Sequence, residues 1–598
     1  MTADDTRRPV GLGCMRLSSP SVNEPRAIAA LHAALDAGVT LLDTADVYAP
    51  TDGDLGHNER LITRALAAWS GDRARVQVAS KGGLTRPGGR RWIPDGRARH
   101  LVAAAEASRA ALGVDAIDLY QLHAVDPRTP LATSVRALAE LRAAGVVRAI
   151  GLCNVTLGQL RDASKVAEID AVQVALHLGD DQAIHAGLVE HCRERGIALL
   201  CHTPLGGPTG WPRRARTPAL RAVAGRRGVT PAEIALAWLC DLGPHVTPLP
   251  GATRPETAAS AAAGQRLVLD DDDRRALDEI APAGRIARTP RASRRPGSAA
   301  ADVVLVMGSP AAGKSTWVRD LVAAGHRRLN RDLTGGSLTA LAGALERGLA
   351  GGGRRFVLDN TYPSRAARSR VIEAAWRHRA EVRCVWLDTS LEDAQVNAVF
   401  RMLDAHGRLL DPHELSGPKK ADPVAIPPRA LFDYRRALEP PDADEGFAAI
   451  DVVSFARAAG PGRTRRALLI DLEHLPADPA PLRRWRERGW LILCTSWQPG
   501  VASGATRAAE VDRRLTELRD RLGLDDAVYC GHGPGPPICW CRKPLPGLAA
   551  LLIHRHGLDP PRCHLVGQGA PDRGLASRLG FGWIEAGAPG ALDAVDLR

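Results

Sequence analysis

Short apolar runs alternate with longer stretches rich in alanine and leucine through the first half of the chain. The longer stretches are typical of helices, and the short runs, bounded by polar residues, are typical of buried strands. Eight strand–helix units in succession predict a parallel (β/α)8 barrel. The eight runs cover residues 10–18, 39–46, 76–83, 115–123, 147–155, 170–178, 197–205 and 246–252.

Polar side chains gather where these runs end. Chance would scatter such residues along the runs, whereas a (β/α)8 barrel carries its active site at the C-terminal ends of its strands. The pattern therefore favours a catalytic site at that face. The residues are Asp43, Lys81, His123, Asn154 and Gln173.

Two stretches with almost no large apolar side chain divide the chain further. Residues 285–300 and 456–465 cannot bury a core, so we expect both to be flexible linkers. The chain then has three blocks, residues 1–284, 301–455 and 466–598, and we expect an α/β multidomain protein. The first linker is rich in arginine, with Arg285, Arg288, Arg291, Arg294 and Arg295.

The second block opens with a phosphate-binding signature. Residues 302–307 are typical of a buried strand, residues 308–316 form the glycine-rich stretch GSPAAGKST, and a helical stretch follows. In this context backbone N–H groups of the loop can cradle phosphates. Lys314 adds positive charge for the β- and γ-phosphates of ATP, and the hydroxyl of Ser315 suits Mg²⁺. The other loop residues that we expect at the nucleotide are Gly308, Gly313 and Thr316.

The last block contains three apolar runs, which end in Asp471, near Thr495 and near Asp572. A loop rich in glycine and proline, between the second and third runs, carries four potential metal ligands. Three thiolates and one imidazole suit a tetrahedral structural zinc ion. The alternative is that four unrelated residues share one loop. The four are Cys530, His532, Cys539 and Cys541.

The first block resembles the aldo-keto reductase family over residues 10–280, through LLDTADVY, VASKGG, DLYQLH, GLCN and PGATRPE. By position, the resemblance implies a catalytic tetrad of Asp43, Tyr48, Lys81 and His123. Lys81 would lower the pKa of Tyr48, whose hydroxyl gives a proton to the carbonyl oxygen. Asp43 would keep Lys81 charged, and His123 would orient the carbonyl. Each residue alone also has a structural reading, as a helix cap, rim aromatic, surface charge or core histidine.

The same resemblance implies an NADPH site and a small carbonyl substrate. Asn154 and Gln173 match positions that hold the nicotinamide amide, and Leu205 and Gly206 match a loop near the pyrophosphate. Arg254 matches a position that pairs with the adenosine 2′-phosphate, which favours NADPH over NADH. The sequence departs from the family pattern where an aromatic often stacks on the nicotinamide and where acidic and amide residues follow the cofactor arginine. These positions are Leu176, Ala259, Ser260 and Ala261.

The second block resembles the kinase domain of polynucleotide kinase-phosphatases over residues 302–455, through LNRDLTGG, FVLDNTYPSRAAR and RALFDYRRALEPPDADEGF. The resemblance implies phosphoryl transfer from ATP to a 5′-hydroxyl of DNA or RNA, with Asp332 as general base. Asp359 would lie near Mg²⁺ and the phosphates, and Arg401, at a lid position, would stabilise the transferred group. Asp332 can also be read as a turn residue before Gly335.

The last block resembles zinc-loop phosphatases of the haloacid dehalogenase (HAD) superfamily, those that act on histidinol phosphate and heptose bisphosphate. Asp471 matches the nucleophile, Thr495 and Lys543 match phosphate-binding positions, and Asp572 matches an acidic residue near Mg²⁺. The sequence departs from the family in having Glu473 as the acid/base and Gln568 in place of an acidic ligand, and in reading TSWQPG after the second run. Loss of a carboxylate weakens Mg²⁺ binding. An active phosphatase and a retained fold used for structure or end-binding therefore both remain open.

Composition adds few constraints. The formal net charge of +12 permits a polyanionic partner, but a basic solvated surface explains it as well. The first residues, MTADDTRRPV, are polar, and no apolar run is long enough to span a membrane. Scattered cysteines suit a reducing compartment. We therefore expect a cytoplasmic protein without a membrane partner.

The leading interpretation is a fused enzyme, with an NADPH-dependent carbonyl reductase, an ATP-dependent 5′-hydroxyl kinase and a phosphatase-like domain that together suggest nucleic-acid end repair. One alternative is a metabolic reductase fused to a small-molecule kinase and phosphatase. Another is a nucleic-acid-binding module with an inactive phosphatase domain and the barrel as a redox sensor. Salt-sensitive binding to oligonucleotides separates the first and last from the second.

Overall fold

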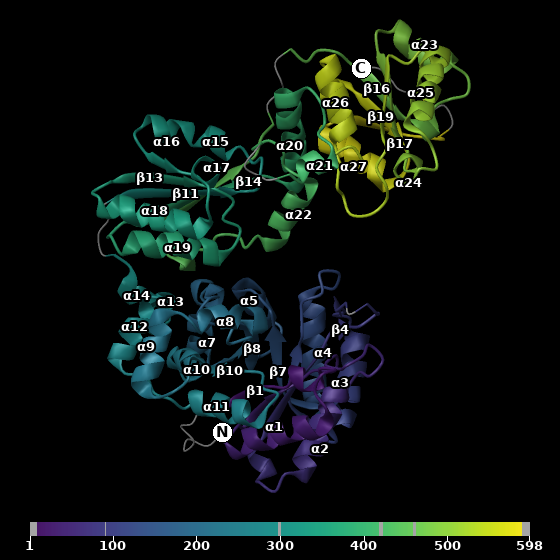
Figure 1. Ribbon diagram of the computed structural model, residues 1–598. Helices are drawn as coiled ribbons and strands as arrows, with labels where there is room; N and C mark the ends of the chain where they lie inside the picture. The colour runs from purple at the N-terminus through teal and green to yellow at the C-terminus, as the bar shows by residue number, and fades with distance from the viewer. Residues whose placement is uncertain are drawn as a thin grey trace. The chain divides into compact units, whose positions relative to one another are not determined.

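The computed structural model describes residues 9–89, 91–296, 301–417, 422–457, 462–588 and 592. The chain divides into two compact units, Met1–Arg295 and Pro296–Arg598. The first unit is built on one large parallel sheet and the second on two, as the colours of Figure 1 allow the reader to follow.

The first unit is an eight-stranded parallel barrel whose strands follow one another in chain order. A bridge between Gly13 and Gly251 closes the sheet, and the Gly13 N–H donates to the Pro250 carbonyl (3.0 Å). The strands are β1 (Gly11–Gly13), β2 (Leu41–Asp43), β3 (Gln77–Gly82), β6 (Ile117–Leu122), β7 (Val147–Cys153), β8 (Ala171–Ala175), β9 (Ala198–His202) and β10 (Val246–Pro248). A small hairpin, β4 (Leu84–Thr85) and β5 (Ile93–Pro94), follows β3.

Helices surround the barrel strands (Figure 1). They are α1 (Glu24–Asp36), α2 (His57–Ala68), α3 (Ala98–Leu112), α4 (Leu131–Ala143), α5 (Leu157–Ser164), α6 (Gln182–His185), α7 (Leu188–Arg195), α8 (Gly207–Arg214), α9 (Pro218–Arg227), α10 (Pro231–Asp241), α11 (Pro255–Gly264) and α12 (Asp271–Asp278). Their apolar faces and the strands make one large core. A second, small core lies inside the barrel and joins Leu41, Ala79, Leu200 and Leu249 from strands around the ring.

Local sequence explains where barrel elements start and close. α10 begins at a capping box in which Thr230 and Glu233 satisfy each other's backbone N–H groups, with Pro231 at the first helical position. Gly11 is required where β1 meets β10, because a Cβ there would lie 2.5 Å from the Pro248 carbonyl oxygen.

Residues 285–296 correct the prediction of a flexible linker, because they fold against the barrel. α13 (Ala283–Arg288) buries Ala287 in the barrel core, and α14 (Arg291–Arg294) follows it. The arginines supply the reason, since Arg288 pairs with Asp241 and Asp278 on two barrel helices. Acidic partners thus replace the apolar side chains that this stretch lacks. Residues 297–300 of the predicted linker lie outside the described residues.

The second unit begins with a five-stranded parallel sheet in the order β12-β13-β11-β14-β15. The predicted helix after the glycine-rich loop is two short helices that meet at Val318, whose ψ of −8° interrupts helical geometry. The strands are β11 (Asp302–Gly308), β12 (Arg327–Leu329), β13 (Arg355–Asp359), β14 (Glu381–Asp388) and β15 (Ala449–Ser454). The helices are α15 (Lys314–Trp317), α16 (Arg319–Ala323), α17 (Arg331–Thr334), α18 (Leu338–Ala350), α19 (Arg365–Trp376), α20 (Leu391–His406), α21 (Pro412–Leu415) and α22 (Pro428–Ala437).

The last part of the chain forms another five-stranded parallel sheet, in the order β18-β17-β16-β19-β20. Its strands are β16 (Ala467–Asp471), β17 (Leu491–Trp497), β18 (Asp526–Cys530), β19 (His564–Gly567) and β20 (Gly582–Glu585). Its helices are α23 (Ala480–Glu487), α24 (Gly500–Ser503), α25 (Ala508–Leu522), α26 (Gly547–His556) and α27 (Gly569–Leu579).

Helices that flank the two sheets of the second unit pack against one another. α20, which follows the first of these sheets, packs against α26 and α27 of the other (Figure 1). One apolar cluster includes Val399 and Met402 from α20 together with Trp540 and Ala550 from the last part of the chain. At the described ends of the predicted second linker, Arg457 pairs with Asp393 and Arg463 lies over the Phe400 ring, and residues 458–461 lie outside the described residues.

The predicted α/β multidomain fold with a (β/α)8 barrel is confirmed. Further parallel α/β sheets follow the barrel, as expected from the strand–helix alternation. Within the described residues, none of the helices combines the length and the apolar character that crossing a membrane requires.

Candidate functional sites

The tetrad predicted from the sequence comes together at the strand ends of the barrel. Lys81, on β3, is fully buried, and its Nζ donates to Asp43 Oδ2 at the end of β2 (2.8 Å). The same ammonium donates to the Thr44 carbonyl (2.7 Å) and to the Tyr48 hydroxyl (3.3 Å). His123 follows β6, and its ring meets that of Tyr48 edge-on, with centroids 5.6 Å apart. The four side chains form one contiguous group.

Burial and neighbouring charges together set the protonation states of Tyr48, Lys81 and His123. Burial raises the pKa of Tyr48 to about 12, while Lys81 lowers it by less. The effect of Lys81 has the direction expected from the sequence, but the cost of burying a phenolate exceeds it, so the net shift of the Tyr48 pKa is upward. Burial would lower the pKa of Lys81, but Asp43 and Tyr48 raise it above its ordinary value. Burial, with Lys81 nearby, holds the pKa of His123 well below 6.5. At neutral pH the site therefore has a protonated tyrosine, a charged lysine and a neutral histidine.

Trp92 belongs to this site although the sequence analysis did not single it out. Its ring centroid lies 5.8 Å from those of both Tyr48 and His123, and the side chain is 41% exposed. It stands just before β5 in a loop rich in glycine and arginine. The signal that could have found it is a lone tryptophan in an otherwise polar loop that follows a catalytic strand. Trp92 gives the site an apolar wall.

The predicted nicotinamide ligands lie next to the tetrad. Gln173 Nε2 donates to Asp43 Oδ1 (2.7 Å). Asn154 adopts a left-handed backbone conformation (φ 56°), and its Nδ2 donates to the His123 carbonyl (3.2 Å). Its Oδ1 lies 3.0 Å from His202 Nε2. Both amides therefore form hydrogen bonds with residues of the tetrad.

The remaining predicted cofactor residues lie on loops after later strands. Leu205 and Gly206 follow β9, and the Gly206 carbonyl accepts from Arg214 (3.1 Å). Arg254 is exposed at the N-terminus of α11. An exposed guanidinium at a helix N-terminus suits a phosphate.

A cavity of about 470 Å³ lies at the strand ends of the first sheet of the second unit. Its wall combines the glycine-rich loop, the start of α17, the end of β13, one face of α20 and the segment 422–427. The predicted residues that line it are Gly313, Lys314, Ser315, Thr316, Asp332, Asp359 and Arg401. Gly308 ends β11 just before the loop.

Lys314 and Asp359 of this cavity already have polar partners within the protein. Lys314 Nζ donates to the carbonyls of Gly308 (2.9 Å) and Ser309 (2.6 Å). Burial lowers the pKa of Lys314 to about 8, although Asp359 opposes the shift. Arg328, which the sequence analysis did not single out, donates to Asp359 (2.8 Å) and to Ser315 Oγ (3.1 Å). A guanidinium thus joins the two oxygen ligands that Mg²⁺ would use.

Asp332 lies in the first turn of α17 and is exposed to the cavity. Asn330 holds this turn, since its Oδ1 accepts from the Asp332 N–H (2.7 Å) and its Nδ2 donates to the Asp359 carbonyl (2.6 Å). Arg401 reaches the same cavity from α20. The carboxylate of Asp332 and the side chains of the glycine-rich loop therefore face one space.

Carboxylates and a lysine meet at the strand ends of the last sheet. Asp471 ends β16, is paired in register with Thr495 on β17, and lies where the strand order reverses between β16 and β19. Lys543 forms ion pairs with both Asp471 and Asp572, the latter in the first turn of α27. Burial would lower the pKa of Lys543, but these two carboxylates raise it. Glu473 is exposed, and Gln568 is exposed at the start of α27.

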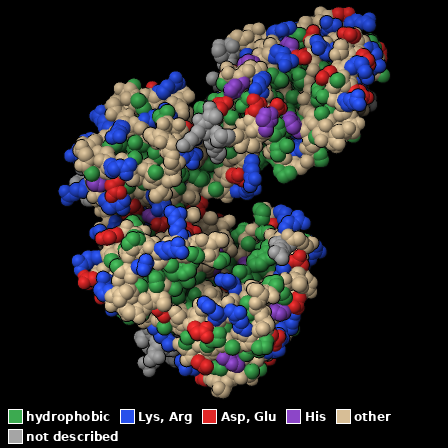
Figure 2. Space-filling model, in the orientation of Figure 1, with side chains coloured by type: hydrophobic (Ala, Val, Ile, Leu, Met, Phe, Trp, Pro, Cys, Tyr) green, Lys and Arg blue, Asp and Glu red, His purple; other side chains and the backbone are tan. Residues whose placement is uncertain are grey.

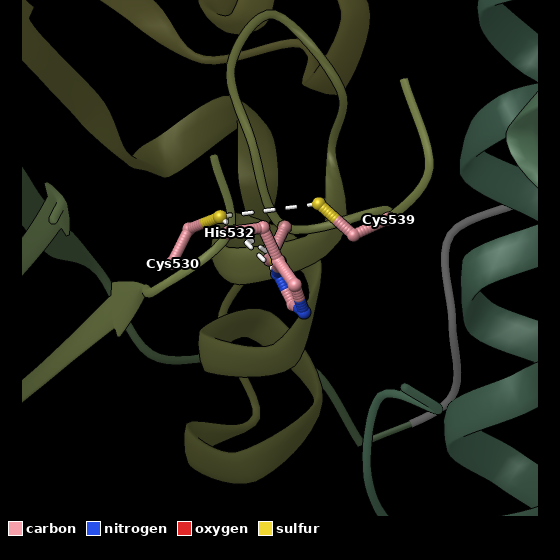
Figure 3. Close-up of side chains that lie close together, drawn as sticks. Cys530, His532 and Cys539 are labelled. Atoms are coloured by element: carbon pink, nitrogen blue, oxygen red, sulfur yellow. Dashed lines mark hydrogen bonds between the residues drawn. The ribbon is translucent and has the colours of Figure 1, made fainter. Parts of the chain in front are cut away.

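The four predicted zinc ligands converge near this site. Their ligand atoms all lie within 4.8 Å of one another, and three of them are drawn in Figure 3. Sγ of Cys530 lies 3.9 Å from that of Cys539 and 3.3 Å from that of Cys541, and His532 Nδ1 lies 3.2 Å from Cys541 Sγ. A tetrahedron with Zn–S bonds of about 2.3 Å places sulfurs roughly 3.8 Å apart. The donor set and its spacing therefore fit a zinc ion.

The surface charge is spread rather than gathered. On the face drawn in Figure 2, lysine and arginine side chains lie interspersed with acidic ones over both units. That face presents no single basic stripe.

Comparison with known proteins assigns the first two parts of the chain. Residues 9–282 match the model of the aldo/keto reductase family, and residues 303–407 match that of an AAA domain, AAA_33. A glycerol dehydrogenase of Gluconobacter oxydans is 26% identical, with 47% of this chain and 93% of that one covered and a TM-score of 0.40. An aldo-keto reductase of Klebsiella pneumoniae, solved with NADPH, is 26% identical, with 46% and 90% covered and a TM-score of 0.40. The chain thus carries an aldo/keto reductase domain followed by a P-loop, kinase-like domain.

Proposed function

We propose that this chain is a fused enzyme that reduces a small carbonyl compound with NADPH, phosphorylates 5′-hydroxyl ends of DNA or RNA with ATP, and carries a phosphatase-like third domain. The observation that carries the proposal is the buried contact of Lys81 with Asp43 and Tyr48. Structural ion pairs do not need a tyrosine hydroxyl at their centre, whereas proton transfer to a carbonyl does.

The residues of the barrel can perform the proton part of a reduction. NADPH, when bound, supplies the hydride for the carbonyl carbon. Tyr48 keeps its proton at neutral pH and gives it to the carbonyl oxygen, and Lys81 stabilises the phenolate that forms. Neutral His123 donates a hydrogen bond to the same oxygen. Asp43 holds Lys81 charged and in position.

The cofactor residues support NADPH as the hydride donor. Gln173 and Asn154 offer amide groups beside the tetrad, and each is held by a contact with the site. Arg254 is exposed where a 2′-phosphate would gain from both its guanidinium and a helix N-terminus. The test is oxidation of NADPH and of NADH by model aldehydes. Equal use of the two cofactors by the wild type and by Arg254→Ala would remove the basis for NADPH.

The P-loop cavity supports phosphoryl transfer to a hydroxyl. Lys314 can turn from loop carbonyls to the β- and γ-phosphates, and Ser315 and Asp359 would hold a Mg²⁺ ion that offsets the charge of these phosphates. Asp332 is exposed in the same cavity and can take the proton of the hydroxyl as its oxygen bonds to the γ-phosphorus and ADP leaves. Arg401 would neutralise the transferred group.

The kinase test uses the full chain, γ-labelled ATP and 5′-hydroxyl DNA and RNA oligonucleotides. We expect label on the oligonucleotide, and we expect Asp332→Asn to abolish transfer while it spares ATP binding. Asp320→Asn, on the exposed surface of α16, is the matched control. Label on a nucleoside or sugar but on no oligonucleotide supports a metabolite kinase. Salt-sensitive binding of oligonucleotides without transfer supports a binding module.

The third domain supports binding of a phosphorylated end more strongly than its hydrolysis. Lys543 pairs with both Asp471 and Asp572, and by the resemblance Gln568 replaces a carboxylate that would hold Mg²⁺. These residues leave fewer oxygen ligands for the Mg²⁺ ion that hydrolysis would need. Release of phosphate from 3′-phosphorylated oligonucleotides by the wild type, lost in Asp471→Asn, would instead establish a phosphatase.

Zinc in the cysteine loop is expected to be structural, because all four donors come from the protein and three of them are buried. Metal analysis of the full chain tests this. We expect about one zinc ion per chain, lost in Cys539→Ser. If this substitution does not change the metal content, the four residues share the loop without binding zinc.

A further inference from the structure

Trp540 connects the cysteine loop to the P-loop half of the second unit. It stands between Cys539 and Cys541 and is 1% exposed. Its apolar cluster joins Ala550, from its own part of the chain, to residues of the P-loop half. The cluster that contains it includes Ala311 of the glycine-rich loop, Met402 and Leu403 of α20, Leu415 of α21 and Leu431 of α22.

The indole of Trp540 also makes a polar contact with the wall of the nucleotide cavity. Its Nε1 donates to the Ile426 carbonyl (2.8 Å). Ile426 lines the cavity together with its neighbours Asp422, Pro423, Ala425 and Pro427. Prolines make this segment poor in backbone donors, and its other anchor to a helix is the contact between Asp422 and His406 (2.8 Å). Among the described residues, Trp540 therefore supplies one of two side-chain hydrogen bonds that join this wall to other elements.

The cysteine loop fixes Trp540 from the opposite side. Both sequence neighbours belong to the cluster of metal ligands. The Trp540 carbonyl accepts from the Gly547 N–H (3.0 Å), and a Cβ at residue 547 would lie 2.5 Å from that oxygen. Leu409, between α20 and α21, packs against the cysteines themselves. The backbone of Trp540 is thus held by the cysteine loop, while its indole reaches the cavity wall.

We propose that the cysteine loop is a structural part of the nucleotide site, and that Trp540 is the positioning residue that holds the Ile426 wall against the bound nucleotide. The inference rests on nucleotide binding by the P-loop cavity and not on which acceptor is phosphorylated. A zinc ion in the loop stabilises the indole position, because two of its ligands flank Trp540. Metal occupancy and nucleotide affinity are then coupled although no ligand of the metal lines the cavity.

Simple core packing is the competing explanation, and a conservative substitution separates the two. Trp540→Phe keeps a large aromatic ring in the cluster and removes the N–H that reaches Ile426. Trp485→Phe is the matched control, since Trp485 is also buried and its indole also donates to a backbone carbonyl, that of Leu592 (2.9 Å). Trp485 does not line the cavity. A packing effect alone appears as similar losses of thermal stability in both variants.

The experiment measures binding of Mg·ATP to the full chain by calorimetry. We expect Trp540→Phe to weaken binding by about three- to tenfold and Trp485→Phe to leave it unchanged. In turnover, the half-saturating ATP concentration rises in Trp540→Phe while the rate at saturating ATP is kept, because the indole touches no reacting group. NADPH oxidation by the barrel serves as an internal control and stays constant. Equal affinities in wild type and Trp540→Phe overturn the proposal, as does a wild type that binds no nucleotide.

A second arm tests the metal. Chelation of the wild type, followed by removal of the chelator, is expected to weaken nucleotide binding at least as much as Trp540→Phe. Chelation of Trp540→Phe is expected to add little, because both changes act on the same contact. Fully additive effects would mean that the metal does not act through Trp540. Absence of oligonucleotide labelling with normal nucleotide binding refutes the 5′-kinase and leaves this proposal standing.

Discussion

The barrel site and the P-loop cavity hold similar side chains in opposite ways. In the barrel, Lys81 is fully buried and already bonded to Asp43 and Tyr48, the groups that it would serve in the proposed proton transfer. In the cavity, Lys314 rests on carbonyls of its own loop, and Arg328 occupies the oxygens of Asp359 and Ser315. The difference follows from the chemistry. A proton donor must be tuned before the substrate arrives, whereas phosphate sites hold charges whose partners come with the ligand.

The largest effect that would test this contrast is a matched pair of lysine substitutions. Lys81→Met leaves Asp43 buried without its cation and is expected to destabilise the barrel by about 3–5 kcal/mol. Lys314→Met is expected to cost less than about 1 kcal/mol, because burial already disfavours that charge, as its lowered pKa of about 8 records. Hydrogen exchange at β2 and β3, compared with β11, reports the two units separately. Equal losses would contradict the contrast.

Tyr48→Phe tests whether the contacts that Lys81 makes with Asp43 and Tyr48 before substrate binds serve catalysis and not only stability. We expect the rate of aldehyde reduction at saturating NADPH to fall by roughly 10²–10⁴-fold, because the proton donor is lost while the ring still packs. NADPH affinity stays within about twofold. Tyr120→Phe is the control, since Tyr120 is buried in the outer barrel core and makes no contact with Lys81. A Tyr48→Phe enzyme with wild-type turnover would refute the assigned role.

Arg328→Gln tests whether Arg328 and Mg²⁺ compete for the same oxygen atoms in the cavity. The substitution leaves the fully buried carboxylate of Asp359 without its cation, so we expect the second unit to lose about 1–3 kcal/mol of stability. Mg²⁺ can then bind the freed oxygens, and thermal melting of the variant is expected to gain more from Mg²⁺ than the wild type does. Arg327→Gln, exposed on the same strand, is the control. Identical gains would show that Arg328 and Mg²⁺ do not compete.

The smallest expected effect is the dependence on pH. Below pH 8 Lys314 carries its charge, and above this value the free site loses it, because burial lowers its pKa to about 8. ATP affinity is therefore expected to fall by up to roughly tenfold between pH 7 and pH 9. Aldehyde reduction is expected to change little over this range, since Tyr48, with a pKa of about 12, stays protonated and His123 stays neutral. Calorimetry and NADPH oxidation across that range provide the measurements.

The sequence predicted the parts of each site that depend on local order along the chain. Asp43, Lys81 and His123 end successive strands of a repeating unit, and the glycine-rich loop is one contiguous motif, so their convergence follows from the topology. Lys81 lowers the pKa of Tyr48 as the sequence led us to expect, but burial raises this pKa to about 12, and that burial depends on neighbours that no motif contains.

The contacts that the sequence could not predict join residues that lie far apart in the chain and belong to no recognisable motif. Arg328 and Asp359 are 31 positions apart, and Trp540 and Ile426 are 114 apart. In a chain so rich in arginine, nothing in composition distinguishes Arg328 from a solvated neighbour. The linker was predicted to be flexible because it has almost no large apolar side chain, and the sequence did not show that carboxylates on the barrel helices receive its arginines.

The docking of α13 and α14 on the barrel determines where the two units can be separated by protein engineering. A cut after residue 284 would remove Arg288, so that Asp278 would lose this partner and Asp241 would keep only Arg274, and it would uncover the core beneath Ala287. A reductase truncated after Pro296 keeps the ion pairs of Arg288 and the packing of Ala287 on the core. The shorter fragment is therefore expected to aggregate on expression, and the dozen residues that look most dispensable in the sequence decide whether the barrel can be obtained alone.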